Sequence, residues 1–283
     1  MAEITHAAAK QFAKFIAARE RHRVAKQAGR AVSKPDPIIS KYRFCNVRRN
    51  DDRVTKWIHE HYLEKWRSEP RLWFALIVAR LFNLPGTLSC IEKFVLPFKP
   101  ESMREYLHER AERGNNFNAA YIVSTAGVKI NKIDYVVDSI LFPSWVQREE
   151  VAEFIADHET LNAVHQRLME LPGLASFMAA QVVADLKYAN PDKWYDFYTF
   201  AASGPGSKRG LNRVLGRPID ARMGEGLFRE ELAELRERTQ RLLPSMGLIT
   251  AQDIQNCLCE YDKYERARTG EGRPKQLYTP KEN

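Results

Sequence analysis

The sequence predicts an all-α protein. Apolar residues recur at the three- and four-residue spacing of helices along most of the 283-residue chain, and alternating strand patterns are almost absent. The composition, with 44% hydrophobic and 28% charged residues, is that of a globular chain with a sizeable core. We therefore expect one large or two small helical domains.

The first expected element is a basic helix over residues 3–29. Phe12, Phe15 and Ile16 begin a broken apolar stripe, and lysines and arginines occupy the other faces. Residues 1–50 hold 12 Lys plus Arg against 3 Asp plus Glu, so they account for the whole net charge of +8. Two interpretations stay open: an arm that binds a polyanion, or an amphipathic helix that docks on the core.

We expect the chain to divide into a basic helical arm with its linker over residues 1–37, a helical core over 38–267 and a basic tail over 268–283. Within the core, periodicity and capping residues predict helices over 51–66, 70–82, 87–93, 101–113, 147–157, 160–170, 174–188, 224–243 and 250–268. Only residues 120–130 favour a short strand or hairpin.

Several classes of protein are excluded by simple patterns. No run approaches the eighteen or so apolar residues of a transmembrane helix, and the N-terminus lacks the order of a secretory signal. The four cysteines lack zinc-site spacing. We therefore expect a soluble cytoplasmic protein with reduced thiols, no structural metal and no membrane partner.

The first cluster with chemical character lies just ahead of a predicted helix, where basic and aromatic residues alternate. Arginine forks bind phosphates and aromatic rings stack on unpaired bases, so this composition suits a nucleic-acid or pyrophosphate site. Alternatively, Asp51 and Asp52 cap the helix and pair with the arginines in a structural network. The candidate binding residues are Tyr42, Arg43, Phe44, Asn46, Arg48 and Arg53.

A smaller cluster ends the apolar helix predicted over 70–82. Arg80 and Asn83 either project into a cleft or simply complete the helix terminus, because a cation there is favoured by the helix dipole.

A glycine-rich segment, residues 202–210, contains three glycines, hydroxyl groups and two cations and lies just before a helix. Free backbone N–H groups at a helix start form an anion site, and neighbouring cations would neutralise a phosphate held there. The Walker order is absent, which excludes a P-loop kinase or ATPase, and a plain Gly-Pro turn is the alternative. The candidate residues are Gly204, Gly206, Ser207, Lys208 and Arg209.

The last cluster lies on the predicted C-terminal helix. Glu260, Lys263 and Tyr264 share one face at spacings of three and four residues. A carboxylate beside Lys263 could act as a base toward an amine or anchor an ammonium group, although surface salt bridges are the usual meaning of such a pattern.

The turn over 171–175 resembles the hairpin of helix-hairpin-helix DNA glycosylases, in which a Leu-Pro-Gly-x-Gly turn binds a DNA phosphate. Ala175 stands where those enzymes have the second glycine, which weakens the phosphate site because alanine tolerates left-handed geometry poorly. Phe177 replaces the lysine of lyase-competent members, so strand cleavage is not supported. Asp196 lies about where those enzymes place their catalytic aspartate.

Taken in order, these clusters resemble the α-glutamyl/putrescinyl thymine pyrophosphorylases, also called amino acid:DNA transferases. The resemblance runs from about residue 41 to 278 and is carried by the segments 42–54, 80–83, the hairpin with Asp185, 204–210 and 258–264. The helical domain beside 5-hydroxymethyluracil DNA kinases shares the first segments. This resemblance implies a helix-hairpin-helix glycosylase-like helical fold.

The resemblance also implies a phage enzyme that makes hypermodified thymidine in the cytoplasm of the bacterial host. Such an enzyme replaces the pyrophosphate of 5-pyrophosphoryloxymethyl-deoxyuridine in double-stranded DNA with a small amine or amino acid. No cofactor is expected, although pyrophosphate could bring Mg²⁺ with it. Two alternatives stay open: a monofunctional DNA base glycosylase that uses Asp196, and a non-catalytic DNA-binding module.

Within that interpretation, Lys208 and Arg209 would bind the pyrophosphate and DNA phosphates, helped by Arg43, Arg48 and Arg53. Tyr42 or Phe44 would stack on a base turned out of the helix. The nucleophile would be bound and deprotonated by Asp196, Glu260 or Asp185, with Lys263 beside Glu260. The identity of the amine depends on the volume of its pocket, and no sequence motif specifies it.

Overall fold

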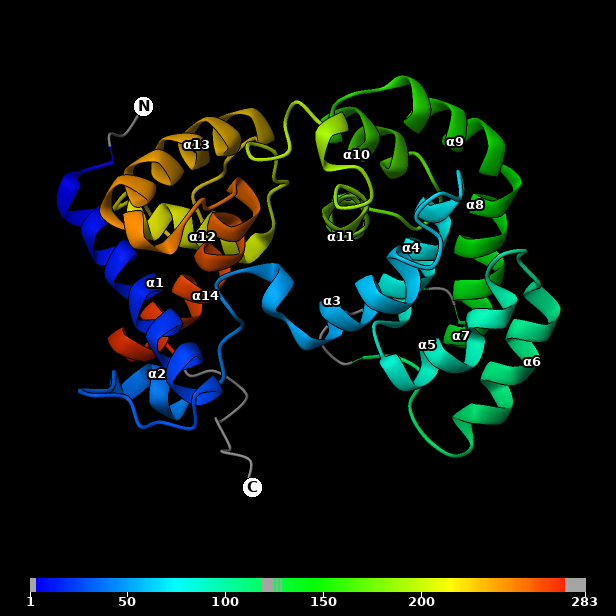
Figure 1. The fold of residues 1–283 in the computed structure, drawn as a ribbon, viewed down its shortest axis with the longest axis horizontal. Helices are drawn as coiled ribbons and strands as arrows, with labels where there is room; N and C mark the ends of the chain where they lie inside the picture. The colour runs from blue at the N-terminus through cyan, green and yellow to red at the C-terminus, as the bar shows by residue number, and fades with distance from the viewer. Residues whose placement is uncertain (1–3, 119–124, 126, 128, 273–283) are drawn as a thin grey trace. The chain divides into compact units, whose positions relative to one another are not determined.

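The computed structural model describes residues 4–118, 125, 127 and 129–272. Within them all regular structure is helical, and no β-strand is formed, which confirms the all-α prediction (Figure 1). The strand or hairpin expected over residues 120–130 falls largely outside the described residues, as does most of the basic tail. The chain forms two compact units, one from residues 1–52 and 198–283 and one from 53–197.

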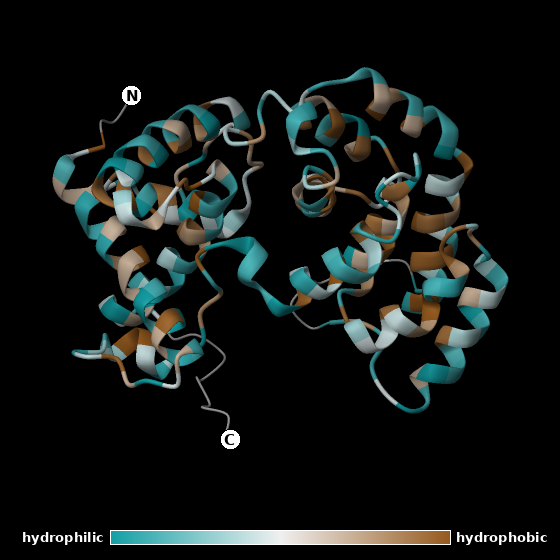
Figure 2. Ribbon diagram, in the orientation of Figure 1, coloured by the Kyte–Doolittle hydropathy of each residue, from teal (hydrophilic) through white to brown (hydrophobic). Residues whose placement is uncertain are grey.

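The first unit is built from both ends of the chain. Its helices are α1 (His6–Gln27), α2 (Pro37–Lys41), α12 (Pro205–Val214), α13 (Glu225–Leu242) and α14 (Ala251–Thr269), with 3₁₀ turns at η1 (Arg49–Asp51) and η6 (Pro244–Met246). Figure 2 shows hydrophobic and hydrophilic residues alternating around α13, the pattern of a helix with one buried face.

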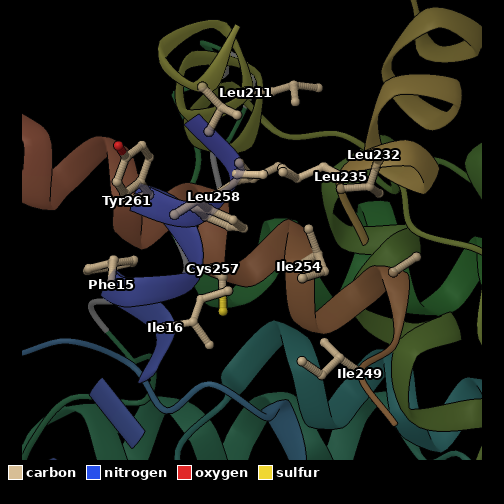
Figure 3. Close-up of a cluster of buried hydrophobic side chains, with 14 of the residues drawn as sticks. Phe15, Ile16, Leu211, Leu232, Leu235, Ile249, Ile254, Cys257, Leu258 and Tyr261 are labelled. Carbon is tan, nitrogen blue, oxygen red and sulfur yellow. The ribbon is translucent and has the colours of Figure 1, made fainter. Parts of the chain in front are cut away.

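The basic N-terminal helix belongs to the core of this unit. Phe12 and Ile16 are fully buried, and Phe15 packs against Tyr261 of α14 with ring centroids 5.4 Å apart. Figure 3 shows Phe15 and Ile16 beside Cys257, Leu258 and Tyr261. The structure therefore agrees with the interpretation in which this helix docks on the core. The boundary expected at residue 37 does not separate a free arm from the core.

Helix α14 carries the strongest end signals of the first unit. Thr250 accepts a hydrogen bond from the Asp253 backbone N–H, and the Asp253 carboxylate accepts from the Thr250 N–H at 3.0 Å, which satisfies two donors at the helix start. Gly270 ends the helix at φ +78°. These signals explain why the helix predicted over 250–268 matches the observed one.

The second unit packs around one buried helix. Every residue of α4 (Leu72–Phe82) is buried, and α11 (Ser176–Leu186) lies against it. The remaining elements are α3 (Arg53–Ile58), the π-helical turn η2 (His59–Leu63), α5 (Pro85–Ile91), η3 (Glu92–Phe94), α6 (Pro100–Ala111), α7 (Lys132–Asp134), the π-helical turn η4 (Tyr135–Leu141), α8 (Phe142–Val146), α9 (Arg148–Asp157), α10 (Leu161–Met169) and η5 (Pro191–Lys193).

The turn over residues 171–175 lies between α10 and α11. Gly173 adopts φ +75°, and a Cβ there would lie 2.5 Å from the Cγ1 atom of Ile140, so only glycine fits. Ala175 has φ −69° and ψ 167°, an extended conformation that any residue adopts. The expected conflict between Ala175 and left-handed geometry therefore does not arise.

Candidate functional site

The glycine-rich segment forms the start of α12. Gly204 precedes the helix, and its N–H donates to the Ser207 hydroxyl at 2.9 Å, which closes the first turn. A Cβ on Gly206 would lie 3.3 Å from the sulfur of Cys259 in α14. The small residues thus let the first turn of α12 sit directly on α14.

A pocket opens beside this first turn, with a volume of about 550 Å³. One wall is the start of α12 and the other is the segment that leads into α13. Three cations line it, Lys208, Arg209 and Arg222, together with a single carboxylate, Asp220. The positive end of a ten-residue helix and a net surplus of two cations make this pocket suited to a polyvalent anion.

Two side chains of α12 hydrogen-bond to the segment that forms the second wall of the pocket. Asn212 of α12 donates to the carbonyl oxygens of Ile219 at 3.1 Å and Ala221 at 3.0 Å. Lys208 donates from Nζ to the carbonyl of Met223 at 2.9 Å. These bonds shape the pocket within the first unit before any ligand arrives.

Arg209 is oriented by a buried carboxylate. Its Nε donates to Asp262 of α14 at 3.0 Å, and Arg213 donates to the other oxygen of Asp262 at 2.9 Å. Asp262 is 1% exposed, whereas the Arg209 side chain is 42% exposed. The shared carboxylate therefore holds the guanidinium of Arg209 through Nε, while the side chain as a whole stays partly exposed at the pocket.

The two aromatic residues proposed for base stacking lie elsewhere. Tyr42 is 9% exposed, and the ring of Phe44 contacts the rings of Phe15 and Tyr264 at centroid distances of 6.1 and 6.4 Å. The Lys263 ammonium group covers Phe44 at 4.8 Å. Tyr42 is buried and Phe44 packs against the core of the first unit, so we do not place them in the candidate site.

Polar residues of segment 42–54 form hydrogen bonds with α14 and with the residues just before it. Asn46 donates to the carbonyl of Asp51 at 2.8 Å, and its own carbonyl accepts from Asn256 at 2.9 Å. Arg48 donates to the carbonyls of Leu248, at 2.8 Å, and Met246. Arg43 is exposed, and so is Arg53 at the start of α3 in the second unit.

Glu260 and Lys263 are neighbours, as predicted from their spacing. Glu260 Oε2 accepts from the Cys45 backbone N–H at 3.0 Å and from Lys263 Nζ at 3.1 Å. Lys263 also donates to the carbonyl of Arg43 at 2.6 Å. Both side chains thus hold the segment around Cys45 on α14, which is the structural alternative to a catalytic pair.

The carboxylate of Asp196 caps a helix in the second unit. Its two oxygens accept from the backbone N–H groups of Leu161 at 2.7 Å and Asn162 at 3.0 Å, at the start of α10. A carboxylate there is stabilised by the helix dipole. Both oxygens are engaged, so this geometry favours a structural role over that of a free base.

The remaining candidates, Arg80, Asn83 and Asp185, meet in the second unit. Asp185 is fully buried and receives two hydrogen bonds from Arg80, at 2.5 and 2.6 Å. Asn83 adopts φ 48° at the end of α4 and accepts from Arg80 at 3.1 Å. Arg80 and Asn83 therefore face a buried carboxylate rather than an open cleft.

Three residues of these two sites had no sequence signal. Arg222 and Asp220 lie in a loop whose approach to Lys208 depends on the fold, and His59, 3.2 Å from Asp185, is 126 positions away from it in the chain. A histidine within a helix, here at the junction of α3 and η2, is too common a feature to indicate a site.

The thiols of α14 are held in the protonated form. Burial raises the pKa of Cys257 to about 11, and burial together with the nearby Glu260 raises that of Cys259 to about 12.

In the described part of the chain no group of three or more His, Cys, Asp or Glu residues is placed to hold a metal ion. No helix among the described residues is long and apolar enough to cross a bilayer.

The chain matches the family model described as the 5-hmdU DNA kinase helical domain over residues 6–273. It belongs to this family. A curated relative, the 5-hmdU DNA kinase of Bacillus phage SP10, is 27% identical over 218 residues, which cover 64% of this chain and 32% of the relative. The chain thus spans about a third of that kinase. No solved structure matches it.

Proposed function

We propose that this member of the helical-domain family is a DNA transferase of phage thymidine hypermodification, active in the infected bacterial host. It would replace the pyrophosphate of 5-pyrophosphoryloxymethyl-deoxyuridine in DNA with an amine or amino acid. The observation that carries the proposal is the pocket at the start of α12, with Lys208, Arg209 and Arg222 around a volume of about 550 Å³.

The chemistry of the reaction matches the charges of that pocket. The carbon–oxygen bond of the substrate breaks as the carbon–nitrogen bond forms, and the departing pyrophosphate takes the electron pair and gains negative charge. Cations and helix N–H groups held in place before the reaction stabilise that charge more in the transition state than in the ground state. In our proposal Lys208, Arg209 and Arg222 bind the leaving group.

Family membership supports DNA as the partner. The relative's name places 5-hydroxymethyldeoxyuridine in DNA as the substrate of its kinase, and the pyrophosphorylated form of that nucleotide is a chemically reasonable product of such phosphorylation. The present chain lacks the Walker order of a P-loop kinase, so we propose that it acts after the kinase step.

A direct assay tests the proposal. DNA that contains 5-pyrophosphoryloxymethyl-deoxyuridine is incubated with the protein and a panel of amines and amino acids. Released pyrophosphate is measured, and the nucleosides are analysed by mass spectrometry. A new thymidine adduct with one equivalent of pyrophosphate supports transfer, whereas abasic sites would indicate a glycosylase and binding without either product a recognition module.

The pocket assignment has its own test. The double variant Lys208→Ala/Arg209→Ala should lower the rate of pyrophosphate release by about 10²-fold or more, because each lost charge contact to the leaving group is of the kind that costs several kcal/mol. The matched control is Lys99→Ala/Arg113→Ala, which removes two exposed cations from the second unit. Equal rates in wild type and the pocket variant would contradict the assignment.

A further inference from the structure

The second unit carries an aromatic stack at its surface. Trp57 of α3 and His61 of the following turn η2 lie with their rings nearly parallel, at a centroid distance of 4.2 Å and an angle of 10°. His61 is exposed and Trp57 is half-buried, whereas Tyr42 of the first unit is buried. A flat ring at the surface is available to stack on a flat ligand.

His61 is held in place on one side only. Its Nδ1 atom lies 2.9 Å from the carbonyl oxygen of Trp57, and because a carbonyl only accepts, Nδ1 carries the hydrogen and donates it. In the described part of the chain, the ring of His61 meets no second ring and its Nε2 atom has no hydrogen-bond partner. One face of the imidazole lies on Trp57, so the opposite face remains for a ligand. A ring that is already held loses little side-chain entropy on binding.

The stack rests on the core of the second unit. The Trp57 ring lies 6.0 Å from the ring of Tyr62, which is fully buried and donates from its hydroxyl to the Leu88 carbonyl at 2.9 Å. His61 belongs to the π-helical turn η2, and short π-helical segments are frequent at functional sites. A rigid support and an irregular turn therefore coincide at an exposed ring.

A second pair in the same unit shows which features distinguish this one. Phe154 and His158, at the end of α9, stack at 3.7 Å and 15°, and His158 Nδ1 lies 2.8 Å from the Phe154 carbonyl oxygen. The stack and its hydrogen bond are thus a local arrangement of residues four apart in a helix, which does not indicate a ligand by itself. His158, however, is half-buried, and residues 150–164 around it hold four Asp plus Glu and no Lys or Arg.

The surroundings of Trp57 and His61 have the opposite charge. Residues 53–67, which bracket this pair as 150–164 bracket the other, hold four Lys plus Arg against two Asp plus Glu, a net charge of +2. Arg53, four residues before Trp57, is exposed and forms no hydrogen bond or ion pair within the described residues. Cations beside an aromatic ring are the combination that binds unpaired nucleic acid, because the cations contact phosphates while the ring stacks on a base.

We propose that the open face of His61, supported by Trp57, stacks on an unpaired base of DNA, with Arg53 on a neighbouring phosphate. The inference rests on DNA as the partner in the proposed function, and it concerns the second unit alone. The base extends the stack of two rings to three. Because every base has a flat face, the surface prefers unpaired over paired bases and discriminates little among the four.

The central test compares two variants of His61 that differ in one respect. His61→Phe and His61→Leu both lose the hydrogen bond to the Trp57 carbonyl and any charge of the imidazole, but only His61→Phe keeps a flat ring. Fluorescence anisotropy measures binding of the whole protein to a duplex with one unpaired base and to the fully paired duplex. Wild type should prefer the unpaired base. His61→Leu should bind it about tenfold more weakly, and His61→Phe should stay near wild type.

The salt dependence and a matched control separate stacking from other effects. Because a ring that stacks on a base displaces no counterions, the slope of log K against log salt should be the same in His61→Leu and His61→Phe. His158→Leu, at the acidic stack, should bind both duplexes as wild type does. Melting temperatures establish that each variant is folded. In the complex, the ring current of the stacked base should move the proton resonances of the His61 ring upfield.

Equal affinities of His61→Leu and His61→Phe for the unpaired base would overturn the inference. Equal losses in His61→Leu and His158→Leu, or unmoved resonances of His61, would do the same. None of these measurements uses pyrophosphorylated DNA. A protein that binds the unpaired base through His61 but releases no pyrophosphate with any amine would therefore contradict the proposed function alone, and a protein that transfers an amine without preferring the unpaired base would contradict this inference alone.

Discussion

Gly210 of α12 lies directly against the backbone of Leu258 in α14: a Cβ built on Gly210 would come within 2.1 Å of the Leu258 carbonyl oxygen. No rotamer change relieves such a contact, because the obstructing atom belongs to the backbone. The start of α12, and with it the pocket that holds Lys208 and Arg209, depends on this close approach.

The contact predicts the effect of one methyl group. Gly210→Ala should lower the free energy of unfolding by about 3 kcal/mol, at the upper end of overpacking costs, because the two helices must separate. Gly226→Ala is the matched control, since that glycine of α13 has open space around its Cβ position and alanine favours helices. Urea unfolding of both variants measures the difference, and equal stabilities would contradict the close packing.

The same contact explains where sequence patterns succeed and fail. The buried helices around residues 70–82 and 250–268 were predictable, because their apolar residues and end signals lie within the helix itself. The sequence does not predict that helix α12 begins at Pro205, since Gly204, Pro205, Gly206 and Gly210 are weak helix formers. Packing on α14 requires glycine at position 210 and leaves little room for a side chain at 206, and the local sequence does not show this tertiary contact.

The residues of the candidate site also differ in how well the sequence predicts their roles. Lys208 and Arg209 were predictable as an anion-binding pair from two cations after a glycine-rich turn. Tyr42 and Phe44 were proposed as stacking rings on composition alone, and composition does not distinguish an exposed aromatic ring from one in the core. The sequence likewise does not indicate which carboxylate a charged residue such as Arg80 will contact.

The role of Asp196 leads to a second prediction. Asp196→Ala should lower the free energy of unfolding by about 1 kcal/mol, because two N–H groups at the start of α10 lose their acceptor. Asp196→Asn keeps one acceptor oxygen and should lose less. Thermal unfolding and pyrophosphate release are measured on both variants, and a large loss of rate with unchanged stability would indicate that Asp196 takes part in the chemistry.

The exposed face of α1 leads to a third prediction, on DNA binding. Lys10, Lys14 and Arg21 are exposed, and at about 100° per residue they fall within about 40° of one another around the helix. Replacing all three with Gln should reduce the slope of log K against log salt by up to about 2.7, if each contacts one phosphate. Fluorescence anisotropy over a salt series measures the slope.

The charge replacement is a cleaner test than removal of the helix. Phe12 and Ile16 are fully buried in the first unit, so a chain without α1 should lose much of its helical circular dichroism and cooperative unfolding. The control for the charge variant replaces Lys99, Arg113 and Lys129 with Gln, which removes the same charge from the second unit. An equal change of slope in both variants would mean that net charge, rather than the face of α1, controls binding.

The thiols of α14 lead to the fourth prediction, a loss of stability at alkaline pH. The pKa of Cys257 is raised by burial from 9.0 to about 11, so above pH 9 the unfolded chain releases a proton that the folded chain keeps. The folded state then binds more protons, and the free energy of unfolding falls as the pH rises. For Cys257 alone the loss at pH 10 amounts to about 1.4 kcal/mol.

Cys259 acts in the same direction, because burial and the Glu260 carboxylate raise its pKa from 9.0 to about 12. Urea unfolding at pH 8 and pH 10 should therefore give a smaller loss for Cys257→Ala than for wild type, by about the 1.4 kcal/mol that belongs to this thiol. The variant starts from a lower stability at pH 8, because Arg19 loses its hydrogen bond to the sulfur, at 3.2 Å, so the comparison is between the two pH differences and not the absolute values. An identical loss in both proteins would mean that the Cys257 thiol ionises in the folded state as readily as in the unfolded chain.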